Sequence, residues 1–375
     1  MKRWIAAVLI AGSASLTYAQ TDGPGYTAAI IIEASSGRVL YERNANTPLP
    51  TASMAKMMTL LIAMDRVKEG SLKLDEPVPI SARASKMGGS QIFAKEGQTF
   101  PLQTILAAVM IQSANDAAQA LAEKIAGSSE AFADLMNDKA RAMGLKNSMF
   151  YDPHGLPNKE TGKDDQMSAA DLAKLGMELM KYPLMREYAA MQTMPFTNAT
   201  FTSGLTNPNH LLRFFGGAYG IKTGYTVPAG FCVTAGAKRG DLDLVAVVMG
   251  AKTGRRGPDS SFSIAARLMN EAFSNYRMID TVKQGTAFGT AAVTGGAVDT
   301  VPVVAGATAK TLVKRGQEGG MQTSFSPSPL SAPVKRGQQV GTVVVKQGGN
   351  IVARVPAIAS GDVATAPWWK KFWPF

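Results

Sequence analysis

The sequence has little cysteine and histidine, with one cysteine and two histidines among 375 residues. A single cysteine excludes an intramolecular disulfide, so we expect the hydrophobic core to hold the fold. Cys232 lies in an apolar, strand-like run and is interpreted as a packing residue. One cysteine with His154 and His210 makes no credible zinc site, so no metal is expected. Neither histidine lies near a G-x-S-x-G motif, which argues against a Ser-His-Asp triad; we interpret His154 as a loop residue and expect His210 to line or support a cleft.

The sequence also lacks concentrated positive charge. Its formal net charge is +11, but the Lys and Arg residues are scattered, with no basic run interleaved with aromatics. This excludes an obvious nucleic-acid groove and favours a solvated basic surface with some attraction to an anionic polymer or membrane. The hydrophobic content of 46% is ordinary for a globular protein. The length is sufficient for two domains.

The first nineteen residues have the pattern of a secretory signal peptide. Lys2 and Arg3 form a positive start, and the apolar run from Trp4 to Ala11 is too short to span a bilayer as a mature helix. The segment Thr17–Ala19 offers a cleavage site, which would leave Gln20 as the first mature residue. We therefore expect the protein to be exported.

A helix is predicted to begin near Thr51 or Ser53 and to run to about Lys68. Pro50 lies just upstream, and apolar residues follow at helical spacing. Ser53 and Lys56 are then three residues apart on one face, close enough for their side chains to touch. A hydroxyl beside an amine at a helix N-terminus can be an activated nucleophile. An N-cap serine with a solvated lysine is the alternative reading of this short pattern.

The remaining pattern divides the chain near Asp280. Before it, helices alternate with apolar strands; after it, helical periodicity stops, and a hairpin signal at Gln347–Asn350 predicts a small β domain with a spacer or docking role. The predicted strands are Tyr26–Glu33, Arg38–Glu42, Ile221–Thr223, Phe231–Lys238 and Leu242–Ala251. The predicted helices start at Leu102, after Asn115, at Ser128 or Ser129, at Ser168 and at residue 260.

The end of the chain is rich in tryptophan. Residues 367–375 hold three of the four tryptophans. If this segment is helical, its apolar face holds Trp368, Trp369, Phe372 and Trp373, and Lys370 and Lys371 lie opposite, as in helices that rest in the membrane interface. We favour a weak membrane anchor over a tail that packs on the β domain.

Three short motifs follow one another along the chain. They are Ser53-Met-Ala-Lys56, Ser113-Ala-Asn115 at a helix break, and Lys222-Thr-Gly224 on a strand. The order S-x-x-K, S-x-N, K-T-G is the pattern of penicillin-binding proteins and serine β-lactamases. Over essentially the whole mature chain, the sequence resembles the D-alanyl-D-alanine carboxypeptidases among the low-molecular-mass penicillin-binding proteins. Further runs with this likeness are Gln112–Ala118, His154–Leu156, Ser168–Leu172 and Gly220–Thr226.

The resemblance implies an α/β (α+β) transpeptidase fold: an antiparallel sheet flanked by helices, an all-helical subdomain, and a small all-β C-terminal domain. The implied divisions are a signal peptide at 1–19, a catalytic domain at 20–278, a β-sandwich-like domain at 279–362 and a membrane-anchoring tail at 363–375. The protein would be periplasmic or otherwise extracytoplasmic, and peripheral on the cytoplasmic membrane.

The resemblance also implies the chemistry. Ser53 would attack the carbonyl between two D-alanines of the peptidoglycan stem and form an acyl-enzyme. Lys56 would take the serine proton, which requires a neutral amine, favoured by burial and by positive charge from Lys222. Ser113 would relay a proton to the leaving amine. No metal or organic cofactor is needed.

Substrate binding would fall to residues of the second and third motifs. Asn115 would hydrogen-bond the acyl side of the substrate. Lys222 and Thr223 would hold the terminal carboxylate, which would make penicillins and other β-lactams inhibitors. Gly224 would let the substrate backbone approach, and the N–H groups of Ser53 and Tyr225 would form the oxyanion hole.

The sequence departs from the family pattern in two places. Many members have His after K-T-G where this chain has Tyr225, which changes tuning and pH dependence more than mechanism because only the backbone N–H is needed. Some members have an arginine for the substrate carboxylate at a place that falls near Ser261 here. Arg255 and Arg256 lie a few residues earlier, and either of them or neither would serve.

Three other functions remain as alternatives. A serine β-lactamase would need a glutamate-activated water, but Glu160 lies in a Lys-Glu-Thr-Gly turn unlike that motif, and the two-domain length argues against it. A DD-endopeptidase acting on cross-linked peptides is a nearer variant. A non-enzymatic, peptidoglycan-binding shape protein is disfavoured by the intact set of two serines and two lysines.

Overall fold

The computed structural model describes residues 25–158, 162–198, 202–254 and 257–368. The predicted signal peptide, Glu160, Arg255, Arg256 and the tail from residue 369 onward lie outside the described residues. Among the helices that are described, none is long and apolar enough to cross a bilayer. Trp368, at the C-terminal limit of the described chain, is exposed.

A five-stranded antiparallel sheet forms the centre of the larger part of the molecule. Its strand order is β10-β11-β12-β1-β2. β12 has a nearly continuous run of apolar residues, as expected for a strand buried on both faces. The bounds are Ala218–Thr226 (β10), Gly230–Arg239 (β11), Leu242–Ala251 (β12), Ala28–Glu33 (β1) and Val39–Arg43 (β2). The predicted strands in this region are confirmed, including the hairpin of β1 and β2.

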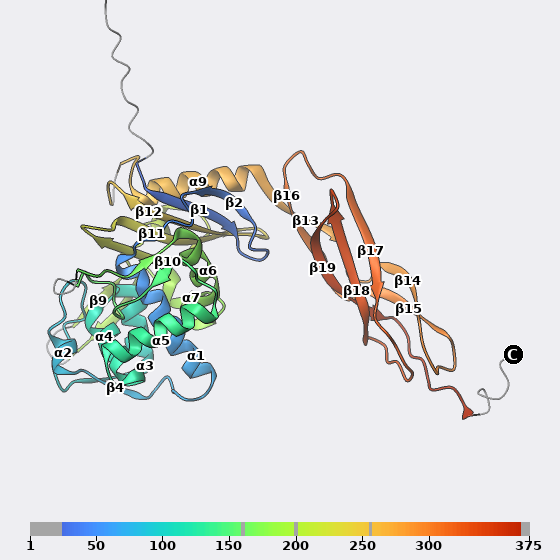
Figure 1. Cartoon of the computed structure of the whole chain (residues 1–375), viewed down its shortest axis with the longest axis horizontal. Helices are drawn as coiled ribbons and strands as arrows, with labels where there is room; N and C mark the ends of the chain where they lie inside the picture. The colour runs from blue at the N-terminus through green and yellow to red at the C-terminus, as the bar shows by residue number, and fades with distance from the viewer. Residues whose placement is uncertain (1–24, 159–161, 199–201, 255–256, 369–375) are drawn as a thin grey trace, which may run out of the picture.

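The two faces of this sheet belong to two separate cores. Ile30 and Val247 pack with the helices on one side, whereas Ile31 and Val248 pack with α9 (Ser261–Asn275) on the other. This alternation follows from the two-residue period of a strand. Figure 1 shows α9 along one face of the sheet and most of the other helices gathered on the opposite face.

The helical side surrounds α1 (Lys56–Lys68), which is buried from Lys56 to Met64. Polar caps begin helices at Ser81, Ser128, Ser168 and Ser260, each of which accepts a hydrogen bond from a backbone N–H three residues on. The helix starts predicted at Leu102, after Asn115, at Ser128 or Ser129, at Ser168 and at residue 260 are confirmed. The other helices are α2 (Ala82–Ser85), α3 (Leu102–Ala107), α4 (Asn115–Ala126), α5 (Ser129–Ala142), α6 (Ala169–Leu179), α7 (Pro183–Ala190) and α8 (Leu211–Phe214).

The helix that follows Pro50 differs from its prediction at the N-terminus. Ser53 lies in a 3-10 turn, η1 (Ala52–Ala55), and the α-helix begins only at Lys56. Ala52 has a φ of 48°, and the Met54 N–H donates to the Thr51 carbonyl across the turn. The tight turn sets Ser53 on the edge of the helical core, while Lys56 starts the buried helix itself.

Three small sheets complete this part of the chain. One has three short strands and the other two have two strands each. These strands are β3 (Leu49–Pro50), β6 (Ser148–Met149) and β7 (Gln166–Met167) in one sheet, β4 (Pro77–Pro79) with β5 (Thr99–Pro101), and β8 (Thr193–Thr197) with β9 (Thr202–Thr206).

The C-terminal part is all β and has its own valine-rich core. The predicted hairpin is confirmed, with Gln347 paired to Asn350. One sheet has the order β14-β15-β19-β18-β17, and β13 pairs with β16 as a two-stranded ribbon. The bounds are Tyr276–Val282 (β13), Ala287–Ala292 (β14), Thr300–Ala305 (β15), Ala309–Lys314 (β16), Met321–Pro327 (β17), Gln339–Gln347 (β18) and Asn350–Ala359 (β19).

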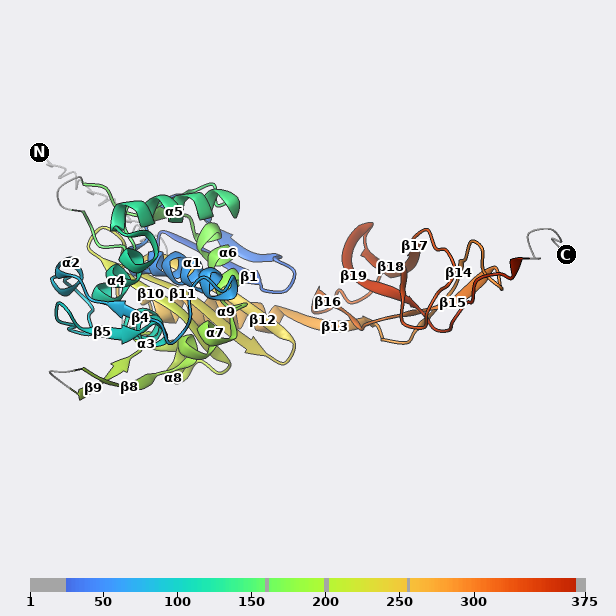
Figure 2. The same cartoon turned by 90° about the horizontal axis from the view of Figure 1, so that it is seen from below.

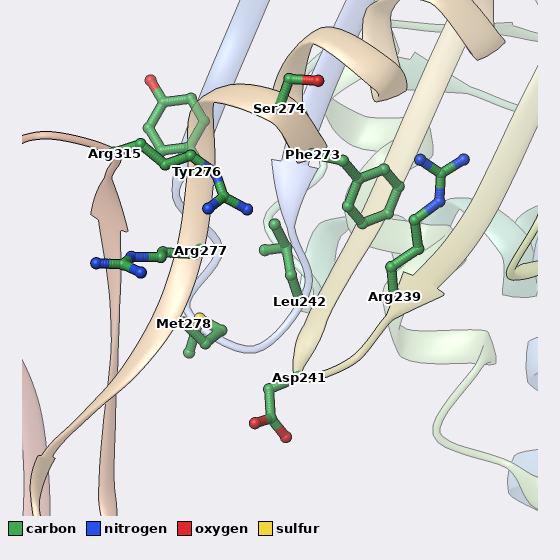
Figure 3. A pocket seen from close by; sticks show the side chains of 9 residues that line it. All are labelled: Arg239, Asp241, Leu242, Phe273, Ser274, Tyr276, Arg277, Met278 and Arg315. Atoms are coloured by element: carbon green, nitrogen blue, oxygen red, sulfur yellow. The ribbon is translucent and has the colours of Figure 1, made fainter.

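The ribbon of β13 and β16 joins the two parts (Figure 2). β13 leaves α9 directly, and Leu312 of β16 packs into the core beneath α9. β13 runs across residue 278, where the sequence places the domain boundary; that boundary stays a prediction. A cavity of about 350 Å³ lies at this junction, and Figure 3 shows the side chains that line it. Its lining is Arg239, Asp241, Leu242, Phe273, Ser274, Tyr276, Arg277, Met278 and Arg315.

Candidate active site

Ser53 and Lys56 meet at the start of α1. The Nζ of Lys56 lies 2.8 Å from the Oγ of Ser53 and 2.7 Å from the carbonyl oxygen of His154. A carbonyl can only accept a hydrogen bond, so the Lys56 nitrogen must donate one N–H to it. A neutral amine held in this way has its lone pair available for the serine hydroxyl.

Lys56 is completely buried. Burial lowers its pKa to about 7, although the carboxylates of Asp152, Asp165 and Asp116 act in the opposite direction. The amine is therefore poised to exchange a proton near neutral pH, which is the requirement for a general base. At the sequence level, positive charge from Lys222 was expected to contribute; burial is the main cause in the structure.

Lys222 comes from β10, far along the chain, and reaches the same place. It is 2% exposed, and its Nζ donates to the Thr223 carbonyl at 3.4 Å. Burial lowers the pKa of Lys222 well below its ordinary value, and the charge of Lys56 lowers it further. The two buried amines are therefore coupled through the charge of Lys56.

The second motif lies at a break between helices. A π-helical turn, η2 (Ala108–Gln112), ends at Ser113, which has a φ of 61°. Asn115 then starts α4, its N–H donating to the Ser90 carbonyl and its side-chain amide donating to the Gly88 carbonyl. The side-chain oxygen of Asn115 is buried and has no hydrogen-bond partner within the described part of the chain. It is thus an acceptor available to a ligand N–H.

The third motif packs directly against the turn that carries Ser53. A Cβ on Gly224 would come within 2.7 Å of the Thr51 carbonyl oxygen and 3.2 Å of the Ser53 nitrogen. Glycine is therefore required for β10 to approach Ser53 this closely. The next residue, Tyr225, is 55% exposed and stacks on Phe231 with ring centroids 4.2 Å apart.

These groups open on a cleft of about 480 Å³. Six of the eight predicted site residues line it, while Lys56 and Lys222 are buried. Its polar members are joined by an apolar wall, which suits a ligand with an aliphatic body. The lining is Ser53, Gly89, Ser90, Ser113, Asn115, Leu156, Pro208, Thr223, Gly224, Tyr225, Phe231, Cys232, Gly254, Ser261 and Phe262.

The histidines and Cys232 occupy structural positions. His210 stacks on Phe262 with centroids 5.5 Å apart, and thus supports the cleft wall as expected. Cys232 is buried, and burial raises the pKa of its thiol to about 11, which fits a packing role. Ser261 lines the cleft at the place expected for a carboxylate-binding arginine. Among the described side chains, no group of three or more His, Cys, Asp or Glu gathers as a metal site.

Sequence reasoning missed the part that the loop Tyr151–Gly155 plays in this site. His154 lies in a loop as predicted, but its backbone carbonyl receives the Lys56 N–H. Asp152 shapes the loop by accepting from the N–H groups of His154 and Gly155. The only signal was the likeness of the run His154–Leu156 to the family, because a main-chain acceptor leaves no mark on residue type.

Comparison with known proteins gives consistent matches. Residues 20–253 match the peptidase S11 family, D-alanyl-D-alanine carboxypeptidase, and residues 276–365 match the C-terminal domain of penicillin-binding protein 5. The D-alanyl-D-alanine carboxypeptidase DacF of Bacillus subtilis is 35% identical over 90% of this chain and 86% of its own length. A D-alanyl-D-alanine endopeptidase of Pseudomonas aeruginosa is 32% identical over 55% of this chain and 64% of its own.

A solved structure extends the likeness to the fold. A peptidoglycan synthesis regulatory factor (PBP3) from Streptococcus pneumoniae has a TM-score of 0.81 at 27% identity, covering 90% of this chain and 99% of that one. The expected fold class, a sheet between helices followed by an all-β domain, is confirmed.

Proposed function

This chain belongs to the D-alanyl-D-alanine carboxypeptidase family of serine peptidases, and we propose that it is an exported enzyme that removes the terminal D-alanine from peptidoglycan pentapeptide stems through an acyl-enzyme on Ser53. The observation that carries the mechanism is the 2.8 Å contact between Ser53 Oγ and a fully buried Lys56 amine. A buried lysine with a pKa of about 7 can act as a base at neutral pH.

In the acylation step, the neutral Lys56 amine takes the hydroxyl proton while Ser53 Oγ bonds to the carbonyl carbon between the two D-alanines. The N–H groups of Ser53 and Tyr225 stabilise the oxyanion. The C–N bond then breaks, and the leaving amine receives a proton through Ser113. Water attacks the ester in the second step and releases the shortened peptide, which restores Ser53.

Binding uses the remaining motif residues. The open acceptor of Asn115 receives an N–H from the acyl side of the substrate. Lys222 and Thr223 hold the terminal carboxylate. A bound carboxylate favours the charged form of Lys222 and so offsets the burial that lowers its pKa in the empty cleft. Penicillins, which carry their own carboxylate, acylate Ser53 in the same orientation.

The test is covalent labelling. A fluorescent penicillin is expected to label the purified protein, and Ser53→Ala is expected to abolish the label without loss of the folded state measured by thermal unfolding. Labelling that persists in Ser53→Ala would refute the assignment of the nucleophile. An adduct that lasts for minutes supports a penicillin-binding enzyme, whereas rapid turnover supports a β-lactamase.

A DD-endopeptidase is the second candidate, because relatives named endopeptidase share up to 32% identity with part of the chain. Measuring D-alanine release from a pentapeptide and cleavage of a cross-linked dimer by the same preparation decides between them. Faster cleavage of the dimer would replace the carboxypeptidase assignment.

We also propose the location and division of the chain: a signal peptide at 1–19, the catalytic domain at 20–278, the β domain at 279–362 as a spacer, and the tail at 363–375 on the outer surface of the cytoplasmic membrane. The tryptophan content of the tail supports the last point. Flotation with anionic liposomes should recover the full chain and lose a variant without residues 364–375; equal recovery would contradict the anchor.

A further inference from the structure

Asp165 is a buried acid that lies outside the three motifs. It precedes β7 and is 2% exposed, so its carboxyl group is almost completely removed from water. Acidic side chains are rarely buried without a specific partner or role. The residues that line the cleft within the described chain do not include it, so it cannot touch the substrate directly.

Asp165 is hydrogen-bonded to two segments, one that leads into Ser53 and one that contacts Lys56. Its backbone carbonyl accepts from the N–H of Thr51 at 3.0 Å, just before the turn that presents Ser53. Its carboxyl oxygen Oδ1 accepts from the N–H groups of Tyr151 at 2.6 Å and Asp152 at 3.3 Å. These two groups begin the loop Tyr151–Gly155.

That loop holds the base. The His154 carbonyl receives the Lys56 N–H, and Thr59 of α1 donates to the Pro153 carbonyl one position earlier. The loop also touches the nucleophile turn, because a Cβ on Gly155 would come within 2.0 Å of the Ala52 carbonyl oxygen. Displacing the loop would therefore move the acceptor that orients the Lys56 lone pair.

We propose that Asp165 is a positioning residue for acylation: it ties the Ser53 turn to the loop that orients Lys56, and it acts through hydrogen bonds rather than through charge. This inference rests on the proposed function of Ser53 and Lys56. It predicts that the carboxamide of asparagine, which keeps the Oδ1 acceptor, can replace the carboxyl group.

The surroundings favour a neutral carboxyl. Burial and the charge of Asp152 raise the pKa of Asp165 well above its ordinary value, although the N–H groups of Tyr151 and Asp152 and the charge of Lys56 oppose the rise. Its second oxygen, Oδ2, has no hydrogen-bond partner within the described chain. A bare buried carboxylate oxygen is far more costly than a protonated one.

Several groups around Lys56 affect its pKa, and the test must distinguish an ionised Asp165 from a neutral one among them. The Ser53 hydroxyl and the His154 carbonyl contact it. Asp152, Asp165 and Asp116 raise its pKa when they are ionised, and its own charge acts on Lys222. If Asp165 were ionised in the working enzyme, it would hold a proton on Lys56 and its removal would lower the pKa of that amine. If Asp165 is neutral, its replacement by asparagine leaves that pKa unchanged.

The experiment compares Asp165→Ala and Asp165→Asn in the full-length protein, with Asp164→Ala as a control at the neighbouring, half-buried aspartate. The second-order rate of labelling by a fluorescent penicillin is measured across pH, together with the temperature of unfolding. We expect Asp165→Ala to acylate about ten- to a hundredfold more slowly. Asp165→Asn should stay within about fivefold of the parent with the same pH midpoint.

Several results would overturn the inference. These are a folded Asp165→Ala that acylates at the parent rate, an Asp165→Asn as slow as a folded alanine variant, or an Asp165→Asn whose midpoint falls by about one pH unit or more. The asparagine midpoint decides the question even if the alanine variant does not fold. Failure of the proposed function is distinguishable, because the parent protein itself would then not be labelled at Ser53.

Discussion

The active-site cleft and the cavity at the domain junction both gather positively charged side chains, but they place them in opposite environments. Behind the residues that line the cleft, Lys56 and Lys222 are 0% and 2% exposed. At the junction, Arg277 lines the cavity (Figure 3), and its side chain is 46% exposed and lies 2.9 Å from the Glu318 carboxylate. Lys310 is 41% exposed and lies 2.7 Å from the carboxylate of Asp241, another lining residue. The pKa of Lys56 is lowered to about 7 by burial, whereas the hydrogen bond from Lys310 to Asp241 raises the pKa of Lys310.

The difference shows what turns a basic residue into a chemical group. At the junction, water and nearby carboxylates keep the cations charged, so they can only pair. At the cleft, loss of water makes the charged form costly, and it lowers the pKa of Lys56 to the range that the proposed base requires. A cluster of Lys and Arg is therefore not evidence of a reactive site by itself. Whether an amine can act as a base depends on how deeply it is buried and on the hydrogen-bond acceptors around its nitrogen.

The largest expected effect follows from removing the buried amine. Lys56→Met keeps an unbranched side chain of similar length but has no base for Ser53. We expect the rate of penicillin labelling to fall by about 10²- to 10⁴-fold. The unfolding free energy should change by less than about 1.5 kcal/mol, because a buried apolar chain replaces a desolvated amine.

The matched change at the junction is Arg277→Met, which also replaces a basic residue by an unbranched apolar one. It should leave the labelling rate at the parent value, because the water-exposed guanidinium is remote from the cleft lining. Comparable losses in the two variants would break the comparison between the cavities. Labelling by fluorescent penicillin and thermal unfolding measure both.

The pH dependence of acylation provides the next test. Lys56 acts as a base only when it has lost its proton, and its pKa is about 7. The rate should therefore fall about tenfold for each pH unit below that midpoint and level off above it. Stopped-flow labelling between about pH 5 and pH 9 measures the profile, and thermal unfolding at the same pH values controls for loss of structure. A flat profile below pH 7 would exclude Lys56 as the base.

Two glycines extend the comparison from charge to backbone. Gly155 and Gly316 both have left-handed φ values, of 76° and 82°. A Cβ at Gly155 would collide with the Ala52 carbonyl, whereas the space around Gly316 in the β domain is open. Gly155→Ala should cost about 2–5 kcal/mol of unfolding free energy and slow acylation, while Gly316→Ala should cost about 1–2 kcal/mol and leave acylation unchanged. If the two variants lose the same unfolding free energy in chemical denaturation, the loop Tyr151–Gly155 must be able to move away from the turn at Ser53 to make room for the added Cβ.

The elements that sequence predicted well are those whose signal is local. β12 was predicted with its observed bounds, Leu242–Ala251, because a continuous apolar run between turn residues has few other readings. Ser128 and Ser168 cap helices as predicted because capping needs only a hydroxyl and the next turn of backbone. The second and third motifs lie at the predicted helix break and on the predicted strand, and Lys56 of the first motif begins α1.

What the sequence could not show depends on contacts between distant segments. The 3-10 turn at Ser53 depends on a left-handed Ala52, which side-chain type disfavours rather than predicts. The His154 carbonyl acts through the main chain, so no residue type reveals it. Asp165 stands in a short polar stretch that reads as exposed loop, and only the packing of Thr51 and the loop Tyr151–Gly155 around it makes it a buried acid.

The smallest expected effect concerns Arg239, which lines the cavity at the junction and makes several contacts there. The Arg239 guanidinium lies 4.5 Å from the ring centroids of both Phe215 and Phe273, and it donates to the Gly216 carbonyl and to Asn270. These contacts are near water, where a cation–π interaction contributes about 0.5–1 kcal/mol. Arg239→Ala should therefore lower the unfolding free energy by about 1 kcal/mol and leave the rate of penicillin labelling unchanged.

Arg213→Ala, at an exposed arginine of α8, is the matched control and should be close to neutral for both quantities. Urea denaturation with parallel labelling separates the two properties. A slower acylation in Arg239→Ala would mean that strain at the junction reaches the cleft through β11, whose far end carries Phe231 and Cys232 on the cleft wall. An unchanged rate would mean that acylation depends on the environment of Ser53 and Lys56 and not on the cations at the junction.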